Sequence, residues 1–285
     1  MKKRILTAIL FATFVQATFA ENTPQELDII ATFKYDRFPT PYGTFNAYAE
    51  KPLNSREYLK QINFEQTLAK AKSGDATAQF QIGKMYQLGI QVPKNSQQAF
   101  DWYSQSAKQG NANAQANLAV LYMDGDGVQQ NSQKAIELWT QASQTVPTAK
   151  FNLAVYQLNQ NRNDKAAFAT LEQLAHDNFI PALYALGLYF YHNGSPQDKS
   201  KGFELIKQAA GSGLADAQFH LAQFYMGKLN TPDENQRIQY AEEAQYWVKR
   251  SCRNEHPMAC DWQGHLKELP SILEQIKRDL DKAKP

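Results

Sequence analysis

The sequence lacks a hydrophobic run of the roughly 20 residues that a transmembrane helix requires. The apolar stretch ILTAILFATFV, residues 5–15, has eleven residues and follows three basic ones. We therefore expect no transmembrane segment.

An excess of one charge is also absent. The chain has 30 Lys and Arg against 28 Asp and Glu. The first twenty residues hold three basic residues and no acidic one, so the rest has 27 against 28, a net charge of −1. A near-neutral chain lacks the basic surface that nucleic-acid binding requires, so we expect no nucleic-acid partner.

Catalytic motifs are missing as well. No serine is followed by lysine three positions later, as in the S-x-x-K of serine β-lactamases. The motifs G-x-S-x-G, H-E-x-x-H, the P-loop and G-x-G-x-x-G are absent too. His176, His192 and His220 are scattered among different segments, which favours surface or helix-face positions. We predict no catalytic residue, cofactor or metal.

The N-terminus is typical of a secretory signal peptide. Basic residues precede the apolar stretch, and Thr18 and Ala20 are the small residues that a signal peptidase requires. No cysteine near this point offers a lipid attachment site. We expect cleavage after Ala20 and a periplasmic or secreted protein.

A repeated unit occupies most of the remaining chain. GDATAQFQIGKMYQLG from Gly74, GNANAQANLAVLYMDG from Gly110 and GLADAQFHLAQFYMGK from Gly213 are versions of one pattern. Aligned on their recurring alanine, the units are spaced by 36, 35, 33, 35 and 42 residues. This alanine falls at Ala78, Ala114, Ala149, Ala182, Ala217 and Ala259.

Each unit has the pattern of two helices. Apolar residues at offsets 0, 4, 7 and 8 from the alanine form one face of a first helix. A capping Asn or Asp is expected to open each second helix, at Asn95, Asn131, Asn163 and Asp198. Gly74, Gly110, Asn178 and Gly213 are expected to end the second helices in left-handed conformation.

Helix pairs of this kind bury their apolar faces by stacking. The sequence therefore predicts an all-α fold, an α/α-superhelix. We expect a signal peptide at 1–20, an extended arm at 21–54, a repeat domain of about five units at 55–268 and a capping helix at 269–285.

These units resemble the Sel-one-like repeat (SLR) family. The segment DGDGVQQNSQKAIELW from Asp124 closely follows the family's Gly-x-Gly-Val-x-x-Asp-x-x-Lys-Ala turn, with Asn131 in the Asp position. The similarity covers about residues 60–268. It implies a helical scaffold that binds other proteins. The third unit lacks this turn, and the fifth replaces it with a longer loop.

The two cysteines lie at a junction of repeats. Cys252 falls late in a second helix and Cys260 early in the next first helix, in columns that face each other across a turn. With His256 and His265 they also form C-x3-H-x3-C-x4-H, so zinc or a redox pair are alternatives. In an exported protein a disulfide is favoured, and the resemblance to the secreted cysteine-rich SLR branch, which has C-x7-C here, implies one.

Another motif, DGDG at residues 124–127, suggests a calcium loop. Position 135 is alanine, where a calcium hand needs glutamate, so we interpret DGDG as a turn whose glycines supply positive φ.

A second apolar stripe runs along the first helices. Its position favours a core between repeats, but it also offers a concave groove for a protein partner. The groove candidates are Phe151, Val155, Leu158, Tyr184, Leu188, Tyr191 and Phe219.

The arm at 21–54 holds six aromatic residues between Phe33 and Tyr48, and Pro39 and Pro41 argue against a helix there. It is expected either to cap the first hairpin or to enter the groove or a partner.

Together these features predict an exported, non-enzymatic, monomeric scaffold that binds an envelope protein or a secreted effector, as an immunity or adaptor protein. The alternative that the resemblance leaves open is a β-lactam-binding or hydrolysing enzyme of the cysteine-rich type.

Overall fold

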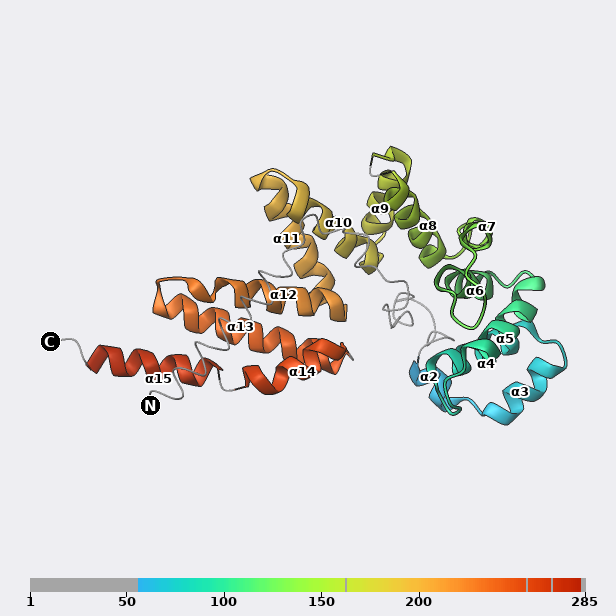
Figure 1. The fold of residues 1–285 in the computed structure, drawn as a ribbon, viewed down its shortest axis with the longest axis horizontal. Coiled ribbons are helices and arrows are strands. Elements are labelled where there is room, and N and C mark those ends of the chain that lie inside the picture. The colour runs from blue at the N-terminus through green and yellow to red at the C-terminus, as the bar shows by residue number, and fades with distance from the viewer. Residues whose placement is uncertain (1–55, 162, 255, 268, 283–285) are drawn as a thin grey trace. The chain divides into compact units, whose positions relative to one another are not determined.

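A computed structural model describes residues 56–161, 163–254, 256–267 and 269–282. These residues form α-helices and one short 3-10 turn, with no strand among them (Figure 1). They divide into two compact units, described residues 56–179 and 180–282, which we call the N-terminal and C-terminal units. The predicted signal peptide and arm lie outside the described residues.

Eight helices make up the described part of the N-terminal unit, and successive helices from α3 onward pack in antiparallel pairs. They are α2 (Arg56–Gln61), α3 (Phe64–Lys72), α4 (Ala76–Leu88), α5 (Ser96–Lys108), α6 (Ala112–Asp124), α7 (Ser132–Ala142), α8 (Pro147–Gln160) and α9 (Lys165–His176).

Six further helices and the 3-10 turn make up the described part of the C-terminal unit. They are α10 (Ile180–Asn193), α11 (Pro196–Gly211), α12 (Ala215–Gly227), η2 (Lys228–Asn230), α13 (Glu234–Arg253), α14 (Pro257–Leu266) and α15 (Leu269–Lys282). The predicted all-α fold of stacked antiparallel helix pairs is confirmed within each unit.

The recurring alanine explains how closely the pairs pack. It is at most 4% exposed at each of its six positions, which lie in the first helices α4, α6, α8, α10, α12 and α14. A methyl group there fills the interface and lets the neighbouring helix approach.

Two of the four predicted N-caps are confirmed. The side chains of Asn95 and Asn131 accept hydrogen bonds from backbone N–H groups in the first turns of α5 and α7, at 3.0 and 2.9 Å. The prediction of Asn163 for α9 was wrong by one residue, because the adjacent Asp164 accepts from two N–H groups of that turn at 3.0 Å.

The prediction of Asp198 as the cap of α11 was also wrong. Pro196 begins this helix, since its ring fixes φ near the helical value and it has no N–H to satisfy. Ser195 is therefore the N-cap, and Asp198 accepts from the backbone N–H of Ser195 at 3.0 Å in a capping box.

Left-handed residues end the second helices as predicted. Gly74, Gly110 and Gly213 have φ of +100°, +83° and +96°, and Asn178 has φ of +57°. Asparagine adopts the left-handed backbone conformation more readily than most residues, because its short polar side chain can form local hydrogen bonds.

The fifth unit departs from the others in its loop and its second helix. The η2 turn follows α12, and α13 has 20 residues where α5 has 13. The extra residues are thus shared between a loop and a longer helix. Among the residues that the structure describes, no helix is both long and apolar enough to span a bilayer.

Candidate functional site

The predicted groove residues lie mostly inside the units. Six of the seven are buried, and Tyr191 is partly exposed. Phe151 contacts Phe179 with ring centroids 5.6 Å apart, and Phe219 lies 4.4 Å from the ring of His256. Such burial is what the core interpretation expects. The seven residues as a groove for a partner stay a prediction.

The two cysteines lie at the junction of helices that the repeat alignment predicted. Cys252 is in the last turn of α13 and Cys260 is in α14. Their Sγ atoms are 2.15 Å apart and their Cα atoms 4.6 Å, which is disulfide distance.

His256 has a structural role beside this pair. Its Nδ1 accepts from the backbone N–H of Ala259 at 3.2 Å, so it caps α14 and its Nε2 bears the proton. The Nε2 lies 3.6 Å from a carboxylate oxygen of Asp216. Among the residues described, no group of three or more His, Cys, Asp or Glu is placed to hold a metal.

The DGDG segment forms the predicted turn. Gly125 and Gly127 have φ of +71° and +72°. A Cβ on Gly127 would lie 2.4 Å from the backbone carbonyl of Ser96, so the turn packs directly on the first turn of α5.

A cluster of partly exposed rings forms where α10, α11 and α12 meet. Tyr191 contacts His220 and Phe224 edge to face, with centroids 6.4 and 6.2 Å apart. Phe224 in turn lies 4.4 Å from Phe203 of α11. Offset and edge-to-face arrangements of this kind are the favourable ones for aromatic pairs. The cluster therefore joins three consecutive helices of the C-terminal unit.

Two histidines belong to this cluster, although the sequence placed them in different repeats. The rings of His192 and His220 are 6.2 Å apart. Burial, and then the neighbouring charge of His192, lower the pKa of His220 to about 4. Burial, and then Lys199, lower the pKa of His192. Burial also raises the pKa of Tyr191, so all three side chains favour their neutral forms near pH 7.

Lysine side chains lie over the outer rings. The Nζ atoms of Lys201 and Lys228 are 4.3 and 5.3 Å from the ring centroids of Phe190 and Phe224. These are cation–π distances. Lys207 lies 5.8 Å from Phe203 in the same way. We call this surface the aromatic–lysine edge, defined by Phe190, Tyr191, His192, Lys201, Phe203, Lys207, His220, Phe224 and Lys228.

His192 and His220 do lie in different repeats at helix-face positions, as expected, but the contact between their rings was not predicted. The two are 28 positions apart, less than one repeat, so they do not share a column in the alignment. His192 lies in the last turn of α10, and His220 lies in the second turn of α12. The stripe of Tyr184 and Tyr191 on α10, which contacts His220, was the available signal.

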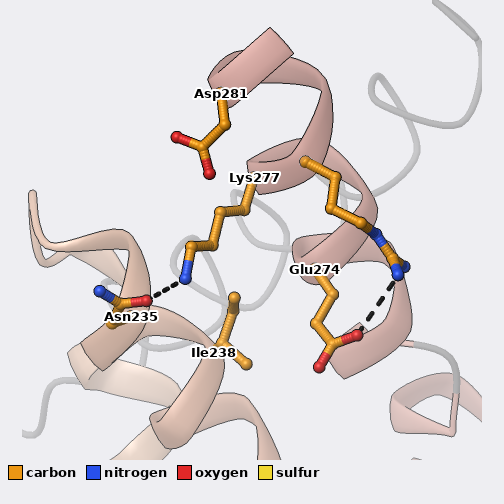
Figure 2. A pocket seen from close by; sticks show the side chains of 6 residues that line it. Asn235, Ile238, Glu274, Lys277 and Asp281 are labelled. Carbon is orange, nitrogen blue, oxygen red and sulfur yellow. Dashed lines mark hydrogen bonds and ion pairs between the residues drawn. The ribbon is translucent and has the colours of Figure 1, made fainter.

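A shallow pocket lies elsewhere in this unit, between α13 and α15. It has a volume of about 260 Å³ and is lined by one apolar residue among polar and charged ones (Figure 2). Lys277 of α15 donates a hydrogen bond to Asn235 of α13, and Arg278 pairs with Glu274 at 3.8 Å. Because both charge signs line it, the pocket selects for no single class of ligand.

Comparisons with known proteins agree with this architecture. A family model described as the Sel1 repeat matches residues 76–111, 112–144 and 180–214. A comparison with curated proteins by sequence gave no match.

Solved structures with similar folds come from several bacteria. A Sel1 repeat protein from Oxalobacter formigenes is 24% identical, with 78% of this chain and 100% of that chain covered and a TM-score of 0.51. A protective antigen of uropathogenic Escherichia coli, described as having an SLR fold, is 19% identical, with 90% and 63% covered and a TM-score of 0.51.

An immunity protein from Pseudomonas aeruginosa is 19% identical over 74% of this chain and 80% of that chain, and its TM-score of 0.45 is too low to support an argument. The three matched segments and the shared fold lead to one conclusion: residues 76–144 and 180–214 of this chain are Sel1 repeats within an SLR-type helical fold.

Proposed function

We propose that this protein is an exported, non-enzymatic scaffold that binds another protein, and that the aromatic–lysine edge is part of its binding surface. The observation on which this depends is the cluster of partly exposed rings that joins α10, α11 and α12. Aromatic side chains held by packed helices contribute much of the binding energy in protein interfaces, because little side-chain freedom is lost on binding.

The scaffold role is supported by the repeat architecture. Stacked helix pairs provide a long, rigid surface, which suits contacts with another folded protein or with an extended segment. Sel1-repeat proteins are generally scaffolds of this kind, and we propose an immunity or adaptor role in the cell envelope.

Export is proposed from the first twenty residues and is supported by the cysteine pair. A disulfide between Cys252 and Cys260 persists in an oxidising compartment such as the periplasm. The intact mass of the protein recovered from the periplasm tests both points, since cleavage after Ala20 and loss of two hydrogens each change it.

Site-specific photocrosslinking in the native envelope tests partner binding. The crosslinking amino acid p-benzoylphenylalanine replaces Tyr189, which is 39% exposed on α10 beside Phe190. The matched control is the same replacement at Tyr246, which is 48% exposed on α13.

A protein captured from position 189 and not from 246 supports the proposal. Capture from 246 alone moves the binding surface to α13. No captured protein from either position refutes the scaffold function, and turnover of nitrocefin by the purified full chain above a heat-denatured sample refutes its non-enzymatic part.

A further inference from the structure

We infer that the aromatic–lysine edge binds an extended acidic segment of the partner protein. Apolar side chains of the segment would pack on the rings of Tyr191 and Phe224, and its carboxylates would pair with Lys201 and Lys228. This inference rests on the proposed function and specifies the chemistry of the partner.

The lysines of the edge give the charge of the partner. Among the described residues, no carboxylate lies within ion-pair distance of Lys201 or Lys228, whereas Lys207 pairs with Glu204 at 3.2 Å. Both lysines lie over ring faces, where the attraction at an exposed site is weak, and Lys201 is also attracted by the carboxylate of Asp198 without forming an ion pair with it. They can therefore leave the rings for a partner's carboxylates at little cost, and doing so uncovers apolar surface.

Nearby acidic side chains already have other roles. Asp198 closes the capping box of α11, and Asp233 accepts two N–H groups as the N-cap of α13. Each of these carboxylates accepts hydrogen bonds from backbone N–H groups at the start of a helix, where negative charge is favoured by the helix dipole. The edge therefore presents Lys201 and Lys228 to a partner, while Asp198 and Asp233 bond to helix ends and Glu204 pairs with Lys207.

The position of the edge favours an extended segment. Lys201 and Phe190 lie beside the loop that joins α10 to α11, and Phe224 and Lys228 lie beside the loop that joins α12 to α13. The contacts thus recur from one helix pair to the next within one unit. A chain that runs across both pairs meets a ring and a lysine at each, in the way that repeat proteins bind linear peptides.

Protein is favoured over nucleic acid or lipid at this surface. The rings pack mostly edge to face on one another, so they offer no open stack of ring faces for successive bases. The chain after residue 20 is also near neutral overall, whereas nucleic acid and anionic membranes select for a strongly basic surface.

A displayed library of random 12-residue peptides, selected on the full-length mature protein, tests the inference. Enriched peptides are synthesised together with versions in which Asp and Glu become Asn and Gln. Their dissociation constants are measured for the wild type, for Lys201→Glu/Lys228→Glu, and for the control Lys72→Glu/Lys249→Glu, which changes two exposed lysines elsewhere by the same charge.

We expect the enriched peptides to combine acidic with aromatic or aliphatic residues. The edge variant should bind them about tenfold more weakly, and the control within about twofold of the wild type. Neutralised peptides should bind the wild type about tenfold more weakly and show no further loss on the edge variant, since the same charge pairs are removed from either side. Far-UV circular dichroism checks that both variants keep their helices.

Enriched peptides without acidic residues, or equal losses in both variants, overturn the inference and leave the scaffold function standing. So does edge-dependent binding of a single-stranded oligonucleotide or of phosphatidylglycerol vesicles in place of peptides. Failure of the scaffold function itself is a different result, namely no protein crosslinked from Tyr189 or Tyr246 in the native envelope.

Discussion

Replacing Gly202 by alanine should destabilise the C-terminal unit, because α10 and α11 touch through their backbones at this point. A Cβ on Gly202 would lie 2.5 Å from the backbone nitrogen of Tyr191 and 2.6 Å from the carbonyl oxygen of Gly187. Ordinary contacts of a methyl group begin near 3.4 Å. Both obstacles are backbone atoms, so no side-chain rotation relieves them and the two helices must separate.

The magnitude follows from two opposing effects. Overpacking of a close interface costs about 1–3 kcal/mol, and contact with backbone places this site at the upper end. Alanine in place of glycine in a helix returns about 0.5–1 kcal/mol. The net loss in the free energy of unfolding should therefore be about 2 kcal/mol. The change also displaces Tyr191, so peptide binding at the edge should weaken with it.

Gly211 on the same helix provides the matched control. Nothing lies within 4 Å of a Cβ at this exposed position, so Gly211→Ala should be neutral or stabilising by up to about 0.5 kcal/mol. Urea unfolding of both variants, followed by circular dichroism and by the fluorescence of the C-terminal unit's tryptophans, measures the difference. A Gly202→Ala protein as stable as Gly211→Ala would refute the close approach of α10 and α11.

Three further outcomes are expected. Reduction of the cysteine pair should lower the free energy of unfolding by about 2–3 kcal/mol through loss of a short closed loop, and an unchanged urea midpoint with and without reductant would contradict this. Because the pKa of His220 is lowered to about 4, its contribution to stability is present above pH 6.5 and is lost as pH falls toward 4. His220→Phe should flatten the fall in urea midpoint between pH 7 and 5, and a slope equal to wild type would exclude the effect. Gly127→Ala should lower the free energy of unfolding by about 2–3 kcal/mol, because it combines a clash with Ser96 and a left-handed backbone conformation. Gly74→Ala, where nothing lies within 4 Å of the added Cβ, should lower it by only about 1 kcal/mol. Equal losses for the two variants in thermal unfolding would argue against the clash.

Much of the fold was predictable because it depends on local chemistry that repeats. The buried alanine, the caps Asn95 and Asn131 and the left-handed Gly110 each act within a few residues of their own position. Such effects leave the same residue type in the same column of every unit. The same locality explains the correct placement of Cys252 and Cys260 at facing positions.

The wrong N-cap predictions concern positions where two nearby residues could each cap the helix. Asn163 and Asp164 are adjacent and are both residue types that cap helices well, and in the structure Asp164 caps α9. In α11 the N-cap is Ser195, three residues before the predicted Asp198, because Pro196 begins the helix. Alignment of the repeats cannot resolve such choices: the third unit lacks the glycine turn that sets the register elsewhere, and in the fourth the start of the helix depends on Pro196.

The binding surface was harder to predict, because periodicity marks an apolar side chain without telling whether a neighbour covers it. Tyr184 and Tyr191 lie on one stripe of α10, seven positions apart, yet Tyr184 is 6% exposed while Tyr191 is partly exposed. Tyr191 is close to the end of its helix, where fewer side chains cover it. The contact of His192 with His220 joins two different repeats and has no counterpart in a single column.

Pairs of aromatic rings similar to those of the aromatic–lysine edge also occur in the N-terminal unit. Phe64 contacts Tyr86, and Phe100 contacts Tyr122, with centroids 6.3 and 5.4 Å apart; each pair joins a second helix to the following first helix. Phe203 and Phe224 form a similar contact between α11 and α12, although Tyr225 and not Phe224 is in the column of Tyr86 and Tyr122.

The paired rings alone are thus a packing feature of the repeat, and they would be expected whether or not a partner binds. Around Phe224, however, the C-terminal unit adds Tyr191, His220 and a lysine over the ring. Packing does not require these additions, because the two N-terminal pairs join their helices with a single pair of rings. Substitution of the lysines should therefore change binding and leave stability almost unaltered, whereas substitution of Phe224 should change both.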